Sequence, residues 1–436
     1  MLLQVYQHGS PRFRQFEIVQ LFQPMTKTSL KIAVATLTAL SLSLSSRVQA
    51  TIAPPTSENY WSLEMSSHSQ ESLAMEVSLR PYIEGYAELV YRNYRDSHQQ
   101  AVILGEAIAA FLAQPNAATH QAAQQAWIQA RQSYLQTEAF RFYEGPIDFI
   151  DPATGEEGPE ARINAWPMNE AFIDYVRGNP DSGIINNKSL DVSIETILEN
   201  DQVTDEADVT TGWHAIEFLL WGQDFNDRGP GQRSFEDFVS DGDTNDRRRT
   251  YLQLVTAQLI EDLSFLENEW KPNANNFRAE FIDRDPKESI SKILTSLATL
   301  SAFEMSSERM AVPLDSGNQE DEHSCFSDTT YQDFVFNAQG IENVYFGNYG
   351  DYDGPGFDEL IAQLDPGINQ TVIAALTQTR EAIASINQPF DGVLASPLGS
   401  DAREEAEMAI TALENQAETF QAVGTVLGVD VEILAE

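Results

Sequence analysis

One short segment of the chain is apolar on nearly every side, and it constrains the fold more than any other. Between Trp213 and Trp221, seven of nine residues are apolar. At helical spacing these side chains cover the whole circumference, so a helix here must be buried. The two exceptions, His214 and Glu217, are three residues apart and share one face of that helix. A buried carboxylate is costly unless it is neutralised, paired or metal-bound, so this polar pair is either a satisfied hydrogen bond or part of a site.

Helical spacing also dominates the chain from about residue 76 onward. Apolar residues recur at three- and four-residue intervals, as in Leu252, Val255, Leu259, Leu263 and Leu266, and strand-type alternation is scarce. Residues 111–140 and 386–420 each contain a Pro-containing linker followed by an Ala/Gln/Glu-rich helix, an echo that either duplication or helix composition alone would explain. We predict an all-α fold of two helical bundles of the four-helix-bundle type, with duplication as the simplest relation between them.

The charge balance limits the partners and ligands of this chain. Its 436 residues carry 67 Asp and Glu against 26 Lys and Arg, a formal net charge of −41. A surface this negative is repelled by phosphate backbones, so we expect no nucleic-acid partner, whereas cations are attracted. Cys325 is the only cysteine, which excludes an intrachain disulfide and Cys-rich metal sites. Any metal site must therefore use histidines and carboxylates.

The first fifty residues resemble a targeting segment. After Met25, the basic Lys27 and Lys31 precede an apolar run at 32–44, and residues 48–50 resemble a cleavage site. We predict a secretory signal cut after Ala50, with Met25 as the start of translation and an upstream extension before it. Residues 51–75 would form a flexible leader and residues 76–436 the folded domain. The mature protein would be exported, without a lipid anchor or a membrane span.

Two further helical stretches place acids on faces that are otherwise apolar. At about 100° per residue, Glu138 continues the stripe of Trp127 and Tyr134, and Arg141 follows one turn later. The competing interpretation is a local surface pair between Glu138 and Arg141.

In the second stretch, residues 290–310, Glu304 and Glu308 fall on the stripe of Leu297, with Arg309 beside them. Residues 321–328 (DEHSCFSD) follow, and their composition alone favours a solvated acidic loop. With His214 and Glu217, the acids Glu138, Glu304 and Glu308 would supply one nitrogen and several oxygen ligands. Such a set suits iron, manganese or zinc, with an arginine balancing surplus charge.

These segments resemble the imelysin-like family. Residues 212–217 (GWHAIE) match its GxHxxE motif, and residues 136–148, 163–167, 306–310 and 324–328 are similar to further family segments in the same order. Within the family, the cyanobacterial iron-regulated branch is the most similar. The resemblance implies two bundles from a duplicated unit, with a site between them around the motif. It also implies a periplasmic protein linked to iron acquisition.

The resemblance assigns candidate residues individually. His214 and Glu217 match the motif and Glu138 matches the acid of the QTE segment, so these three are the predicted metal ligands. Supporting positions without an assigned role are Arg141, Glu308, Arg309 and Ser324, to which the helical phase adds Glu304.

Three functions remain open at this stage. The first is an iron-binding protein, with zinc as the alternative metal and an inner-membrane iron transporter as a partner. The second is a zinc peptidase, because the family is also catalogued as peptidases, but the HExxH motif of typical zinc peptidases is absent. The third is a metal-free module that binds a peptide, haem or a protein. Metal binding without enzymatic activity is favoured.

Overall fold

The computed structural model describes residues 77–226 and 228–434 of the chain. Within these ranges the protein is mostly helical, which confirms the helical character predicted from the sequence. One departure is a short antiparallel hairpin in which β1 (Asn348–Tyr349) pairs with β2 (Tyr352–Asp353). The predicted signal segment and leader lie outside the described residues, so both remain predictions.

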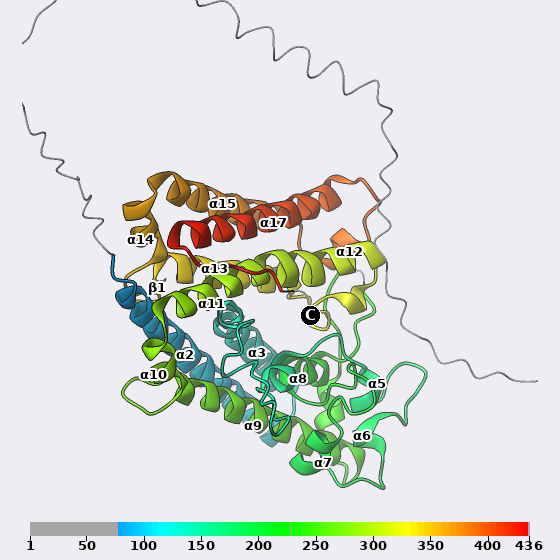
Figure 1. The fold of residues 1–436 in the computed structure, drawn as a ribbon. Coiled ribbons are helices and arrows are strands. Elements are labelled where there is room, and N and C mark those ends of the chain that lie inside the picture. The colour runs from blue at the N-terminus through cyan, green and yellow to red at the C-terminus, as the bar shows by residue number, and fades with distance from the viewer. Residues whose placement is uncertain (1–76, 227, 435–436) are drawn as a thin grey trace, which may run out of the picture. The chain divides into compact units, whose positions relative to one another are not determined.

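A first group of helices includes the one that carries the apolar segment 213–221 (Figure 1). Helix α2 packs against α3 and α9, and the shorter α8 packs against both α3 and α9. Their bounds are α2 (Arg80–Ala113), α3 (Ala117–Thr137), α8 (Gly212–Trp221) and α9 (Thr244–Trp270). Helix α3 begins at a capping box in which Asn116 accepts hydrogen bonds from the backbone of Ala118 and Thr119. It ends in the 3₁₀ turn η1 (Glu138–Phe140).

A second group of helices packs around α17. This helix contacts α15, α11 and the π-helix η3, while α13 packs against α15 and also against α3 of the first group. The bounds are α11 (Pro286–Thr299), η3 (Leu300–Ala311), α13 (Thr330–Phe346), α15 (Pro366–Ser385) and α17 (Asp401–Leu427). The contact between α13 and α3 joins the two groups. The duplication that would relate them remains a prediction.

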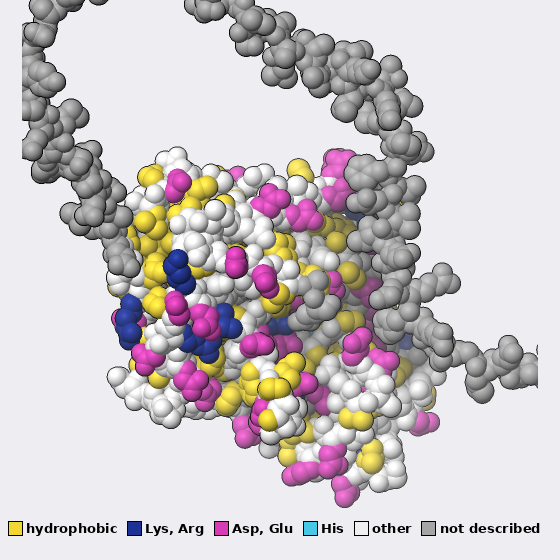
Figure 2. Space-filling view, in the orientation of Figure 1, with side chains coloured by type: hydrophobic (Ala, Val, Ile, Leu, Met, Phe, Trp, Pro, Cys, Tyr) yellow, Lys and Arg dark blue, Asp and Glu magenta, His cyan; other side chains and the backbone are white. Residues whose placement is uncertain are grey.

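Shorter elements connect the long helices. They are α4 (Glu160–Asn164), α5 (Glu170–Ile173), α6 (Gly183–Asn186), α7 (Ile194–Glu199), η2 (Phe235–Phe238), α10 (Phe277–Asp283), α12 (Val312–Ser316), η4 (Gln319–Asp321), α14 (Phe357–Leu364) and α16 (Asp391–Leu394). No helix among the described residues is both long and apolar enough to cross a membrane. On the face shown in Figure 2, acidic side chains are scattered widely, whereas Lys and Arg gather mainly on one side.

Helix α8 is buried along its entire length, as its sequence predicts. All ten residues from Gly212 to Trp221 are buried. Gly212 has a φ of +82°, and a Cβ there would lie 2.4 Å from the carbonyl oxygen of Ile163. Only glycine permits this approach, since it has no Cβ and adopts positive φ at little cost. The backbone of α4 at Ile163 can therefore pack directly against the start of α8.

A buried ionic cluster anchors the long connection between α8 and α9. Asp174 is fully buried and accepts hydrogen bonds from Arg248 Nε at 2.6 Å and Arg233 Nη1 at 2.5 Å. Burial opposes the charged form of Asp174, but the two arginines outweigh this effect and lower its pKa. The connection carrying Arg233 is thus tied to the first helix group rather than free in solvent.

Removing the carboxylate of Asp174 is expected to destabilise the fold strongly. The substitution Asp174→Ala leaves Arg248 without an ion-pair partner among the described residues and Arg233 with only Asp237 at 3.9 Å, and breaking such a buried pair typically costs about 3–5 kcal/mol. The measurement is the free energy of unfolding from urea denaturation, with the exposed Asp181→Ala as control. The control is expected to lie within about 0.5 kcal/mol of wild type. Equal stability of both variants would contradict this role for Asp174.

Candidate functional site

The polar pair of helix α8 forms the centre of a buried hydrogen-bond network. His214 Nδ1 lies 2.9 Å from Glu217 Oε2 on the same helix face. The other oxygen of Glu217 accepts hydrogen bonds from the backbone N–H of Ser327 at 2.9 Å and its hydroxyl at 2.6 Å. His214 Nε2 has no hydrogen-bond partner among the described residues, although His214 is only 2% exposed. One ring nitrogen is therefore fixed and the other is left without a partner.

Burial controls the charge of this pair. It lowers the pKa of His214 well below its usual range, so the imidazole is neutral at physiological pH. It also raises the pKa of Glu217 to about 8, against the opposing effect of the Ser327 hydrogen bonds. A neutral imidazole is the form that binds a metal ion.

A second histidine lies against the first. The rings of His214 and His323 are 4.8 Å apart between centroids, and Trp166 packs edge-on against His323 at 4.7 Å. His323 Nδ1 lies 2.7 Å from Asp333 Oδ2, which also accepts a hydrogen bond from the Ser324 hydroxyl at 2.6 Å. Burial again lowers the pKa of His323 well below its usual range. Two neutral imidazoles, each in contact with an acidic side chain, thus meet inside the protein.

Glu138 lies at the other end of the network, between two arginines. Its Oε2 accepts hydrogen bonds from Arg309 Nη2 at 2.7 Å and Arg141 Nη1 at 2.9 Å. Glu304 accepts a further hydrogen bond from Arg309 at 2.6 Å. Burial alone would raise the pKa of Glu138, but Arg141 and Arg309 outweigh it and lower the pKa to about 2. The predicted alternative of an exposed Glu138–Arg141 surface pair is wrong, since both side chains are buried.

Asn164 connects the two ends of the network. Its Nδ2 lies 3.5 Å from Glu138 Oε1 and 3.4 Å from His323 Nε2. Its Oδ1 accepts a hydrogen bond of 2.6 Å from Arg131, which also reaches Asp333 at 3.4 Å. Asn164 therefore stands between the predicted carboxylate Glu138 and the histidines.

The π-helix η3 explains how Glu304 and Arg309 meet. In a π-helix, backbone bonds join residues five apart, so residues i and i+5 lie one turn from each other. Glu304 and Arg309 have this spacing and form an ion pair. The wider turn also shifts the helical phase used in the sequence prediction. Glu308 is consequently half-buried and bonded to the Ser307 hydroxyl instead of entering the buried network.

A cleft of about 630 Å³ opens beside the acidic end of the network. Its lining includes Arg141, Asn164, Trp166, Glu304 and Glu308. Because Asn164 and Trp166 also contact His323, the cleft ends one side chain away from the histidine pair. It offers a polar approach from solvent to the buried groups.

The structure brings the predicted residues together as two clusters rather than one. His214 and Glu217 form the first cluster, and Glu138, Arg141, Glu304 and Arg309 form the second. Ser324 lies beside the first cluster, where its hydroxyl donates a hydrogen bond to Asp333. Among the described residues, the three predicted ligands His214, Glu217 and Glu138 do not gather their ligand atoms within 4.8 Å of one another.

Several members of the network were missed at the level of sequence: Arg131, Asn164, Trp166, His323 and Asp333. The composition of residues 321–328 favoured a solvated loop, but Glu322, His323 and Ser324 are buried. That expectation is wrong because the segment folds back onto α8, where Ser327 binds Glu217. The available signals were a histidine directly before residues 324–328, which resemble the family, and an asparagine within residues 163–167.

Comparison with known proteins identifies the family of this chain. The imelysin (peptidase M75) family model matches residues 90–420. The chain belongs to the imelysin family. It is 25% identical over 347 residues to iron-regulated protein A of Synechococcus elongatus, covering 77% of this chain and 84% of the relative.

Two crystal structures resemble the fold of this imelysin. An iron-regulated protein A-like precursor from Parabacteroides distasonis matches with a TM-score of 0.63 at 17% identity, covering 80% of this chain and 94% of that one. An imelysin-like protein from Psychrobacter arcticus matches with a TM-score of 0.58 at 16% identity, covering 82% and 98%. At these identities the structures support the fold alone.

The stability of this imelysin is expected to depend on the ionisation of Glu138. The pKa of Glu138 is lowered from 4.5 to about 2 in the folded state. Its contribution is therefore complete above pH 4.5 and is lost as the pH falls towards 2, a loss of about 3 kcal/mol. We expect the free energy of unfolding of Glu138→Gln to fall less steeply than that of wild type over this pH range. Urea denaturation at several pH values measures the difference, and parallel curves would contradict it.

Proposed function

We propose that this imelysin binds a transition-metal ion, iron in the first place and zinc as the alternative, at His214 and the polar groups beside it. The observation that carries this proposal is His214 Nε2, a buried ring nitrogen without a hydrogen-bond partner among the described residues. Leaving such a group unsatisfied costs about 1–3 kcal/mol. A metal ion would satisfy it, and a neutral imidazole is the ligand that iron and zinc both accept.

Glu217 would orient the ligand instead of occupying a coordination position. Its Oε2 faces His214 Nδ1, and Ser327 holds its other oxygen. A carboxylate on the far nitrogen of a metal-bound histidine fixes the tautomer and makes the ring a better ligand. The GxHxxE spacing provides this arrangement on one helix face, because residues three apart are neighbours in an α-helix.

Further ligands would come from the neighbouring network. The His323 ring lies against His214 and is oriented by Asp333 in the same way. Glu138 lies on the other side of Asn164 and would have to move closer to complete the set, because its oxygens and the histidine nitrogens do not lie within 4.8 Å of one another. Because Arg141 and Arg309 already balance its charge, Glu138 would add an oxygen ligand without adding an uncompensated negative charge.

The family and the predicted export support a biological role for this site. A relative of this chain is named iron-regulated protein A, and the net charge of −41 favours cations over anions. We place the protein in the periplasm, where it would capture iron and pass it to an inner-membrane iron transporter. This role combines the predicted signal segment with the His/carboxylate chemistry of the site.

Replacing His214 tests the proposal directly. Purified, metal-stripped protein would be titrated with Fe²⁺ without oxygen, and separately with Zn²⁺, by calorimetry. We expect wild type to take up iron stoichiometrically and His214→Ala to lose this binding while keeping its helical circular dichroism. The control His98→Ala removes a histidine that is paired with Glu267 elsewhere on α2 and α9, and should bind normally. Unchanged iron affinity in folded His214→Ala would overturn the proposal.

The orienting role of Glu217 gives a graded expectation. Loss of a carboxylate that supports a histidine ligand typically weakens metal affinity by about 10–100-fold. The substitution Glu217→Gln should therefore weaken iron binding within this range, whereas His214→Ala should abolish it. Competition with a chelator of known affinity measures both. If Glu217→Gln bound no iron at all, Glu217 would be a direct ligand.

A further inference from the structure

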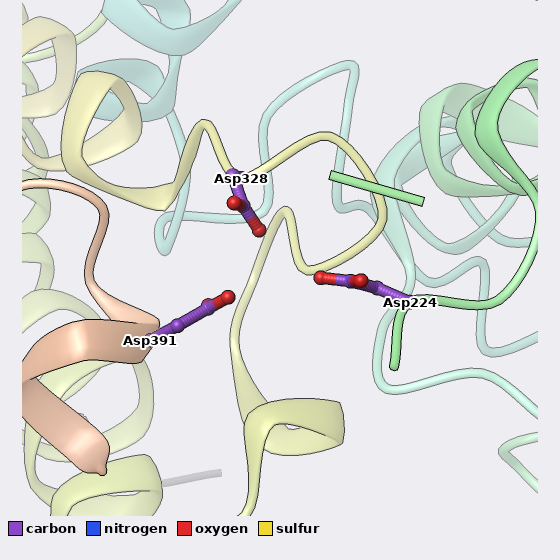
Figure 3. Close-up of side chains that lie close together, drawn as sticks. All are labelled: Asp224, Asp328 and Asp391. Carbon is purple, nitrogen blue, oxygen red and sulfur yellow. The ribbon is translucent and has the colours of Figure 1, made fainter. Parts of the chain in front are cut away.

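Three aspartates from distant parts of the chain converge outside the histidine site. Asp224 follows helix α8, Asp328 lies in the loop before α13, and Asp391 begins α16. One carboxylate oxygen from each can be chosen so that all three lie within 4.8 Å of one another. Figure 3 shows the three side chains pointing towards a common space between their segments.

Two of the three aspartates are buried, Asp328 is half-buried, and most of these carboxylates lack donors. Asp391 is 2% exposed and Asp224 4%, and the adjoining Glu322 is fully buried. Both oxygens of Asp391, of Asp328 and of Glu322 have no hydrogen-bond partner among the described residues. Asp224 alone is supported, by the Asn226 backbone and side chain and by Gln319. Buried carboxylates without donors require a counter-charge or protons.

Elsewhere the protein supplies arginines for acids buried as deeply as these. Asp174 is held by Arg233 and Arg248, and Glu138 by Arg141 and Arg309. Among the described residues, no lysine, arginine or histidine forms an ion pair with Asp224, Asp328, Asp391 or Glu322. The charge of this cluster is thus left for a ligand from solution to balance.

We propose that Asp224, Asp328 and Asp391 form a binding site for a divalent cation of the Ca²⁺ class, with Glu322 as a fourth carboxylate beside it. Calcium takes carboxylate oxygens at about 2.3–2.6 Å, so oxygens bound to one ion lie no more than about 5 Å apart. The spacing of the three aspartates meets this limit. An all-oxygen set selects a hard cation, whereas the imidazoles of the other site suit iron or zinc.

Protonation of the acids is the competing explanation. Burial, followed by the charges of Asp391 and Asp224, raises the pKa of Asp328 to about 8, and burial raises the pKa of Glu322 well above its usual range. Without a cation, the cluster would therefore hold protons at neutral pH. A cation would displace these protons and bind the deprotonated acids.

A bound cation would link three segments of the two helix groups: the segment after α8, the loop before α13, and α16. Asp224 extends from the first group, while Asp391 belongs to the segment before α17 in the second. Asp328 follows Ser327, whose N–H and hydroxyl hold Glu217. The cation would thus stabilise the loop that supports the histidine pair without contacting the histidines themselves. This inference stands independently of iron binding.

The test is a calcium titration of the metal-stripped protein by calorimetry, with thermal unfolding measured alongside. We expect wild type to bind one Ca²⁺ per chain and to melt at a higher temperature as Ca²⁺ is added. Asp391→Asn should lose at least 100-fold in affinity and show no thermal shift. The exposed Asp181→Asn is the matched control and should behave as wild type.

Two further measurements keep the result unambiguous. Asp391→Asn should be at least as stable as wild type in the absence of Ca²⁺, because it removes one uncompensated acid. His214→Ala should bind Ca²⁺ normally, so a failure of the iron proposal would not affect this one. Absence of saturable Ca²⁺ binding and of a thermal shift in wild type would overturn the proposal and favour a protonated Asp328 instead. Equal binding by wild type and Asp391→Asn would also overturn it.

Discussion

The complete burial of helix α8 is the constraint on which the rest of the structure depends. A helix enclosed on all sides places every polar group it carries in a medium without water, where each needs a partner. His214 and Glu217 are the two polar side chains between Trp213 and Trp221. Ser327 satisfies Glu217, which fixes the loop before α13, and this loop brings His323 against His214. One buried helix thus organises segments more than a hundred residues away.

The protein neutralises its buried acids in different ways. Asp174 and Glu138 are each enclosed by two arginines, so their charge is balanced within the fold. Glu217 is bonded to a neutral histidine and a serine, and burial raises its pKa to about 8 although the Ser327 hydrogen bonds oppose this. Asp328 and Asp391 have no hydrogen-bond donor among the described residues, and Asp224 has only Asn226 and Gln319, which motivates the cation site proposed for these three acids. Acids paired with arginines therefore serve the fold, whereas acids without a cationic partner are available to bind a ligand.

The sequence predicted what depends on local spacing and missed what depends on contacts between distant segments. The burial of α8, the proximity of His214 to Glu217 and the inward position of Glu138 all follow from helical periodicity. The half-exposed position of Glu308 does not follow from α-helical periodicity, because residues 300–311 form a π-helix whose side chains have a different angular spacing. The segment 321–328 looked solvated because its composition is polar. Its burial depends on partners such as Arg131 and Asp333, which no local pattern specifies.

The enclosure of α8 also has a kinetic consequence. Segments that lie wholly in the core open only with a free energy close to that of global unfolding, whereas loops open at little cost. All ten residues of α8 are buried, and the approach from the cleft ends at Asn164 and Trp166. An ion held at His214 would therefore leave at a rate set by the movement of these side chains rather than by its own diffusion. Such a site suits retention of a cargo until a partner rearranges the entrance.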